Sequence, residues 1–293
     1  MKLTKKSLIG FVTIGALFVS ATPAFAINGT GLDKDGNPDP ASDQATTNGE
    51  ATFILDDGTG PVVDPTDEPN IITPQPPAST IGQLRINQAP TLKFGEIQIK
   101  GTHTATNAQF SLNTKADGTT ERYIPNYLQV NDTRGDAFGW TVKASATDLV
   151  RVDGTGVPVT GAFITFKDAT VVSASGMDAT DATLTPVVPT ALNTIAPGQA
   201  NIDGIKLDLA TPQAGNSASQ VDMFKADASG TQGINIWTSL YGGVDEAYDI
   251  DATNQNDPAP TNSTIQLHVP SGAKKTPGDY KSVITWEMSN TPA

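Results

Sequence analysis

The sequence contains no cysteine and only two histidines, His103 and His268. Without cysteine the chain has no disulfide bond and no thiolate that could bind a metal or attack a substrate. Neither histidine lies near a Gly-x-Ser-x-Gly nucleophile turn, and the two lack the sequence spacing of a metal-binding pair. We therefore expect no cofactor, no metal site and no catalytic residue. The sequence alone does not exclude a glycosidase that uses two carboxylates, because the two acids of such a site are close in space and not in sequence.

Basic residues are scarce: 18 Lys and Arg stand against 31 Asp and Glu, a net charge of −13. Proteins that bind nucleic acid place clusters of Lys and Arg against the phosphates. This charge balance therefore argues against a nucleic-acid partner. The acidic surplus also accounts for solubility without any further role.

Long hydrophobic runs are missing after the N-terminus. There, an apolar run over residues 8–19 follows three lysines and precedes Ala24-Phe25-Ala26. This pattern is typical of a secretory signal peptide over residues 1–26, cleaved after Ala26. We expect an exported mature chain that begins at Ile27 and has no transmembrane segment. Without the three signal lysines it carries 15 basic and 31 acidic residues, a net charge of −16.

Residues 27–80 are acidic and rich in Pro and Gly, with too little apolar surface to offset the entropy of ordering. We expect a flexible lead with one candidate strand over residues 51–55. The prolines between Pro65 and Pro77 predict an extended spacer.

Short apolar runs between turn signals fill residues 81–293, and no stretch shows a strong helical period. This pattern predicts one all-β domain, an antiparallel β-sandwich with Greek-key, immunoglobulin-like topology. Tyr280, after Gly278-Asp279, is placed to bond back to the preceding backbone as a tyrosine corner. The expected strands cover residues 83–86, 96–100, 127–131, 139–144, 162–166, 205–210, 233–238, 264–269 and 280–288. Residues 177–200 are expected to form a long excursion.

Two tryptophan motifs stand at opposite ends of this domain. Trp140-Thr141-Val142 follows Phe138-Gly139, and Trp286-Glu287-Met288 lies near the C-terminus. Because strand side chains alternate, each Trp shares a strand face with the aliphatic residue two positions later. This arrangement resembles the WxL domain of Gram-positive cell-surface proteins, which carries one Trp-x-Leu early and another at its C-terminal end.

The resemblance covers most of the chain, because an acidic Pro-rich run and a strand before Phe94-Gly95 precede the motifs in the same order. It implies non-covalent attachment to the peptidoglycan of the cell wall, and a role without catalysis. An adhesin that binds a host matrix protein or a partner surface protein is the alternative. In this sequence Val142 and Met288 replace the two leucines, a change that a packing role tolerates more readily than a binding role.

For Trp140 and Trp286, two roles are open. Each is either a core residue or an aromatic platform for wall sugars, and the apolar face of the last strand favours the core. Trp237 and Tyr241 lie in a loop-like setting and are the candidate exposed aromatics. Arg134-Gly135-Asp136 spells the tripeptide that integrins recognise, but a turn ahead of the Trp140 strand explains it as well.

Overall fold

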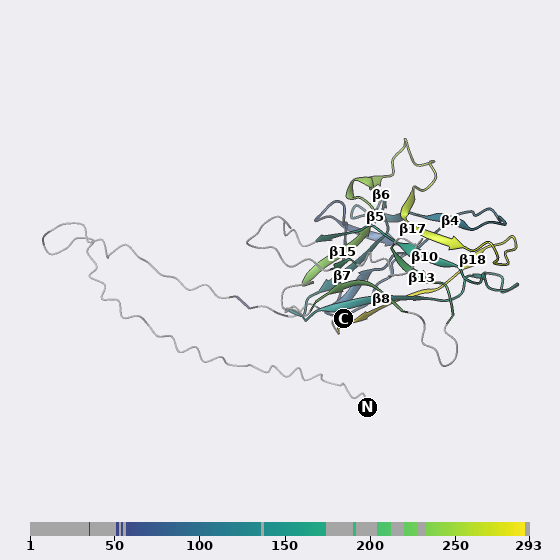
Figure 1. Ribbon diagram of the computed structural model, residues 1–293. Coiled ribbons are helices and arrows are strands. Elements are labelled where there is room, and N and C mark those ends of the chain that lie inside the picture. The colour runs from purple at the N-terminus through teal and green to yellow at the C-terminus, as the bar shows by residue number, and fades with distance from the viewer. Residues whose placement is uncertain are drawn as a thin grey trace, which may run out of the picture. The chain divides into compact units, whose positions relative to one another are not determined.

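Figure 1 shows the computed structural model of the chain, which describes residues 35, 51, 52, 54, 57–135, 138–173, 190–191, 204–211, 220–227 and 233–290. The chain divides into two compact units, Met1–Phe53 and Ile54–Ala293, and the strands of the described residues belong to the second. The described residues of this second unit contain no α-helix and a single 3-10 turn, η1 (Val244–Glu246). In the part of the chain so described, no helix has the length and apolar character to cross a membrane.

The strands of the described residues form five sheets, and each of the four larger sheets takes the name of one of its strands. The β8 sheet has the order β12 (Thr190–Ala191), β14 (Val221–Ala226), β8 (Trp140–Ala146) and β19 (Ile284–Ser289). The β15 sheet has the order β11 (Ala169–Ser173), β15 (Asn235–Tyr241), β7 (Tyr127–Asp132) and β3 (Leu84–Gln88). The β17 sheet has the order β13 (Ile205–Asp208), β10 (Phe163–Phe166), β17 (Thr261–Val269) and β4 (Thr104–Gln109).

The β5 sheet has the order β1 (Val62–Val63), β2 (Ile71–Gln75), β5 (Ser111–Lys115), β6 (Glu121–Ile124) and β16 (Tyr248–Asp249). A last pair joins β18 (Tyr280–Lys281) to β9 (Val150–Arg151). Every strand pair among the described residues is antiparallel. The all-β, antiparallel class is therefore confirmed, whereas the Greek-key sandwich of two sheets stays a prediction.

The main core is shared by the three four-stranded sheets. Alternate residues of their strands project into it, as the period of two requires. Its largest members are fully buried aromatics, Trp140 of β8, Phe166 of β10 and Tyr241 of β15. Buried aliphatic residues fill the space between them, among them Val130, Val142, Ile164, Leu207, Ile265 and Leu267.

β7, an inner strand of the β15 sheet, is buried on both faces. Leu128 and Val130 of β7 belong to the main core, whereas Tyr127 packs into a second cluster with Ile72 and Ile124 of the β5 sheet. All six residues of β7 are therefore buried. In a sheet with one solvated face, buried and exposed residues alternate along each strand. The continuous burial of β7 therefore indicates that both of its faces are covered.

A buried polar layer joins the β15 sheet to β1. Gln129 of β7 is fully buried; its side chain accepts a hydrogen bond from the Val63 amide at 3.0 Å and donates one to the Val63 carbonyl at 2.8 Å. Its amide also donates to Thr238 Oγ1 at 3.0 Å, and Asn87 Nδ2 donates to its carbonyl at 3.3 Å. One glutamine thus serves β1 as a strand partner would, and satisfies backbone groups that would otherwise be buried without bonds.

The predicted flexible lead is wrong for the residues around β1 and β2. Val62, Val63, Asp64 and Ile72 are all buried. Arg122 Nε of β6 lies 3.1 Å from Asp64 Oδ2, and this ion pair fixes the connection between β1 and β2 to the β5 sheet. Burial of the few apolar residues here, together with these polar contacts, outweighs a composition typical of a spacer. Ala51, Thr52 and Ile54 form no strand, and the rest of the strand expected over residues 51–55 lies outside the described residues.

Most of the predicted strands are present, with shifted ends, but the strand expected over residues 96–100 is wrong. Residues 89–103 contain no strand, although Leu92, Phe94 and Ile97 pack against the main core. Their apolar side chains cover the end of the core without joining a sheet. The excursion expected over residues 177–200 lies outside the described residues except for β12.

Replacing Gln129 by Leu tests the polar layer. The variant leaves the amide and carbonyl of Val63 buried without partners, and each such group costs about 1–3 kcal/mol. We expect the free energy of unfolding to fall by about 2 kcal/mol or more in urea titrations. Gln255→Leu, at an exposed site, is the matched control and should stay within about 0.5 kcal/mol of the parent chain. Equal midpoints for the two variants would contradict this account of the layer.

Candidate functional site

The two tryptophan motifs lie on neighbouring strands. β8 and β19 pair in antiparallel register, with Val142 opposite Met288 and Ala144 opposite Trp286. Directly opposed residues of an antiparallel pair project to the same face of the sheet. Trp140, Val142, Trp286 and Met288 therefore share the inner face of the β8 sheet, although about 140 residues separate the motifs in the sequence.

Trp140 is a core residue. Its side chain is completely buried, its Nε1–H donates a hydrogen bond to the Gly233 carbonyl at 3.1 Å, and its ring meets Phe224 edge-on at 4.9 Å. Gly233 has a φ of 79°, and a Cβ there would lie 2.5 Å from Trp140 Nε1. The backbone thus approaches the indole at a distance that only glycine permits. A ring enclosed in this way has no face to offer a sugar.

Trp286 and Met288 differ from the first motif because they are only half-buried. The Trp286 ring packs edge-on against Phe166, with centroids 6.3 Å apart and an interplanar angle of 85°. Among the described residues, β19 is also the last strand in the order of the β8 sheet, and so an edge strand. Edge strands are the part of a sheet that other chains can reach. The second motif is therefore the one closer to solvent.

A groove of about 870 Å³ begins beside β19. Core residues of the β17 sheet, Ile164, Leu267 and Val269, line its floor. One wall is the irregular segment 92–99, and the other is the segment 275–284 that leads into β19. The volume lies within the range of about 300–1,000 Å³ that is typical of ligand sites.

Charged residues stand along the walls of this groove. Lys93 and Glu96 belong to one wall, and Lys275, Asp279 and Lys281 to the other. Three of the chain's 18 basic residues thus lie at a single groove, in a protein with a large acidic surplus. The arrangement combines an apolar floor with both signs of charge at its margins.

Tyr280 holds the second wall in place. Its hydroxyl donates to the Thr276 carbonyl at 3.0 Å and accepts from the Thr276 amide at 3.1 Å, so the predicted bond to the preceding backbone is confirmed. Arg151 donates to Thr276 Oγ1 at 3.0 Å and to the Pro277 carbonyl at 2.8 Å. These bonds fix residues 276–279, which lie in no strand, ahead of β18, and they predefine that side of the groove.

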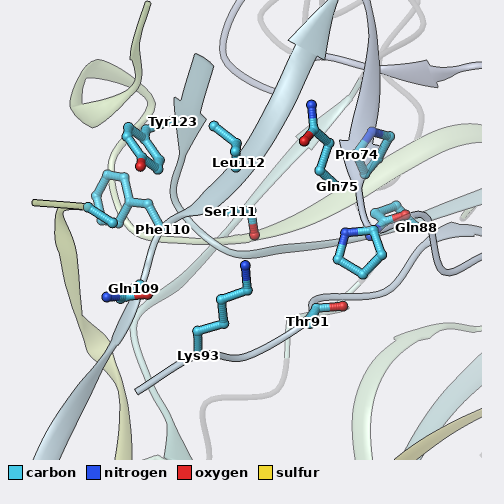
Figure 2. A pocket seen from close by; sticks show the side chains of 12 residues that line it. Pro74, Gln75, Gln88, Thr91, Lys93, Gln109, Phe110, Ser111, Leu112 and Tyr123 are labelled. Carbon is cyan, nitrogen blue, oxygen red and sulfur yellow. The ribbon is translucent and has the colours of Figure 1, made fainter. Parts of the chain in front are cut away.

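A second, smaller pocket of about 100 Å³ lies between the β5 sheet and residues 91–93. Figure 2 shows the Lys93 side chain extending toward Ser111, with Thr91 and Gln109 on either side. The volume is well below the range of about 300–1,000 Å³ found for ligand sites. Lys93 lines both cavities, so the segment 91–93 separates the pocket from the groove.

The prediction that Trp237 and Tyr241 are exposed is wrong. Trp237 is 2% exposed and Tyr241 is fully buried. Trp237 Nε1–H donates to the Ile234 carbonyl at 2.7 Å. The pair Gly242-Gly243 suggested a loop, but β15 runs through Tyr241 and the glycines only mark its end. Both rings belong to the main core, and neither can serve as a platform.

Arg134 of the integrin-like tripeptide is occupied by local contacts. Its guanidinium pairs with the buried Asp132 at 2.7 Å and donates to the Gly139 carbonyl at 2.9 Å. It also lies over the Phe138 ring, 5.2 Å from the centroid. The residue thus braces the turn that leads into Trp140. Asp136 lies outside the described residues.

The two motif tryptophans should differ in their contribution to stability. Trp140→Ala removes a fully buried ring, which typically costs about 3–5 kcal/mol. Trp286→Ala removes a half-buried ring, and we expect a loss of about 1–2 kcal/mol. Chemical unfolding followed by circular dichroism measures both. Equal losses, or a larger loss for Trp286, would show that the second motif carries the packing.

Searches of curated proteins and of solved structures found no match to this chain. A family model, described as WxL domain surface cell wall-binding, matches residues 40–292. The match spans both tryptophan motifs, the groove and the strands from β1 to β19. It includes the motifs even though Val142 and Met288 replace their leucines, as expected if these positions require an apolar residue for packing. The chain therefore belongs to the WxL family of surface, cell-wall-binding domains.

Proposed function

We propose that the chain is exported, loses its signal peptide after Ala26, and attaches without a covalent bond to the peptidoglycan of a Gram-positive cell wall. The observation that carries this proposal is membership of a surface, cell-wall-binding family over residues 40–292. Attachment by this route breaks no bond in the wall, and we assign the protein no enzymatic activity and no cofactor.

The groove beside β19 is the surface that we assign to the wall. Peptidoglycan presents sugar rings with apolar faces and short peptides that bear carboxylates. The apolar floor suits the first, and Lys281, exposed at the margin, suits the second. The tryptophans of the motifs are not part of this contact. They hold β8 against β19 and so position the segment 275–284.

A second candidate function is binding to a partner surface protein, or to a host matrix protein. The observation that favours a protein partner is the position of β19 at the edge of the β8 sheet, since an edge strand can accept a strand from another chain. The contacts of Arg134 do not support recognition through the integrin tripeptide, because its guanidinium is already bound within the turn.

Ile99→Ser tests the groove. Ile99 lines it and is 52% exposed, so the change removes apolar contact with a ligand while leaving the core intact. A loss of about 1 kcal/mol in binding corresponds to roughly a fivefold lower affinity. The measurement is sedimentation of the mature chain with purified peptidoglycan freed of teichoic acid.

The matched control is Ile71→Ser, a change of the same kind at a site on β2 that is 43% exposed and lies outside the groove. It should sediment like the parent chain. Equal sedimentation of both variants would remove the groove from the proposal, whereas a parent chain that stays in the supernatant would refute wall attachment itself. Solubilised wall fragments would identify a glycan hydrolase.

Charge should set the salt dependence of attachment. The mature chain carries a net charge of −16, and wall teichoic acids are also negative. Exposed charges farther apart than about 8 Å are largely screened at physiological ionic strength. We expect added NaCl or millimolar Mg²⁺ to improve sedimentation with intact walls, and to change little on stripped peptidoglycan. Release from intact walls by salt would mean that Lys and Arg hold the protein by ionic contacts, contrary to this account.

A further inference from the structure

The chain's two histidines, which are 165 positions apart, meet on one face of the β17 sheet. His268 of β17 lies directly opposite Phe163 of β10 on one side and Ala105 of β4 on the other. His103 precedes Ala105 by two residues and so projects to the same face, diagonal to His268. Figure 1 shows β10, β17 and β4 side by side.

The contacts of His268 fix both the position and the orientation of its ring. Its Nδ1 lies 3.1 Å from Nε2 of His103, and its Nε2 lies 3.0 Å from the hydroxyl of the buried Thr165. Phe163 stacks on the ring with centroids 4.6 Å apart and an interplanar angle of 5°. The ring is thus held from one side by an aromatic face and at one nitrogen by a hydroxyl.

The spacing of the two facing nitrogens suits a transition-metal ion. Metal–imidazole bonds of about 2.0–2.1 Å place two adjacent ligand nitrogens about 2.9 Å apart at a right angle and about 3.3 Å apart at the tetrahedral angle. The observed 3.1 Å lies between these values. Metal-binding histidines commonly donate their other N–H to a protein oxygen, which fixes the tautomer. Thr165 Oγ1 is placed to accept that bond from His268.

We propose that His103 and His268 form an open, two-histidine chelate for a divalent transition metal such as Cu²⁺, Ni²⁺ or Zn²⁺. In the tautomer that binds, His268 donates its Nε2 proton to Thr165 and presents the Nδ1 lone pair beside Nε2 of His103. The described residues contain no group of three or more His, Cys, Asp or Glu side chains around a common point. Water or an exogenous ligand therefore completes the coordination.

The electrostatic surroundings permit a cation here. Lys206 and Asp208 of β13, which lie on the same face, pair with each other at 2.6 Å, and Lys206 also lies over Phe163. Burial, and then the neighbouring His103, lower the pKa of His268 below its ordinary value of about 6.5. Imidazole binds a metal ion in its neutral form, so metal affinity should fall on acidification as protons compete for the ligand nitrogens.

The experiment uses the mature chain without a histidine tag. With only two histidines, its imidazole protons give two resolvable sets of NMR signals. One equivalent of Zn²⁺ at pH 7.5 should shift both sets together, whereas Mg²⁺ and Ca²⁺, which prefer oxygen ligands, should shift neither. Calorimetric titration should give the affinity order Cu²⁺ over Ni²⁺ and Zn²⁺.

Variants separate chelation from a hydrogen bond that only fastens β4 to β17. His103→Gln and His268→Gln should each lower Ni²⁺ affinity at least about tenfold, to the level of the double variant, because a single imidazole no longer chelates. Thr165→Val should weaken binding about 10–100-fold through the lost orienting bond. Histidine signals that stay unmoved by Zn²⁺ overturn the proposal, and so does a single variant that retains full affinity. The melting temperature of each variant, measured without metal, shows that it is folded.

Discussion

The pairing of β8 with β19 is the contact on which the rest of the domain depends. It joins a strand from the middle of the chain to the last strand, and it places Val142 against Met288 on a single inner face. Trp140 then packs onto Phe224, and Trp286 onto Phe166 of the neighbouring β17 sheet. Because the hydrophobic effect is roughly proportional to the apolar area buried, two tryptophans on one sheet face contribute a large share of this core.

In this arrangement the tryptophan motifs pack the core, and the groove that we assign to the wall is a different part of the domain. Trp140 is enclosed by Gly233 and Phe224, so its contribution to wall attachment is indirect. The groove lies where β18 turns into β19, and its second wall is held by Tyr280 and Arg151. The tryptophan motifs and the groove are thus linked through β19. The motifs require apolar residues of suitable size, and the groove requires that the segment leading into β19 be rigid.

The sequence predicted the features that depend on local pattern. Alternating apolar residues located β3, β7, β8, β10, β13, β15 and the strands from β17 to β19, and the two motifs located the family. What it missed depends on tertiary contacts. β1 and β2 are ordered by Gln129 and by the Asp64–Arg122 pair, which no local pattern indicates. β4 and β5 are polar strands with weak alternation, and Trp237 is buried because it packs into the core that three sheets share. The two histidines meet only through the pairing of β17 with β4.

The central claim is that the motifs build the core while the groove meets the wall. Hydrogen–deuterium exchange of the mature chain, with and without soluble peptidoglycan fragments, tests it most directly. The account predicts slower exchange on binding in residues 92–99 and 275–284, and unchanged exchange in β8, which is already protected by burial. Protection gained in β8 around Trp140, with none in the two groove segments, would contradict it.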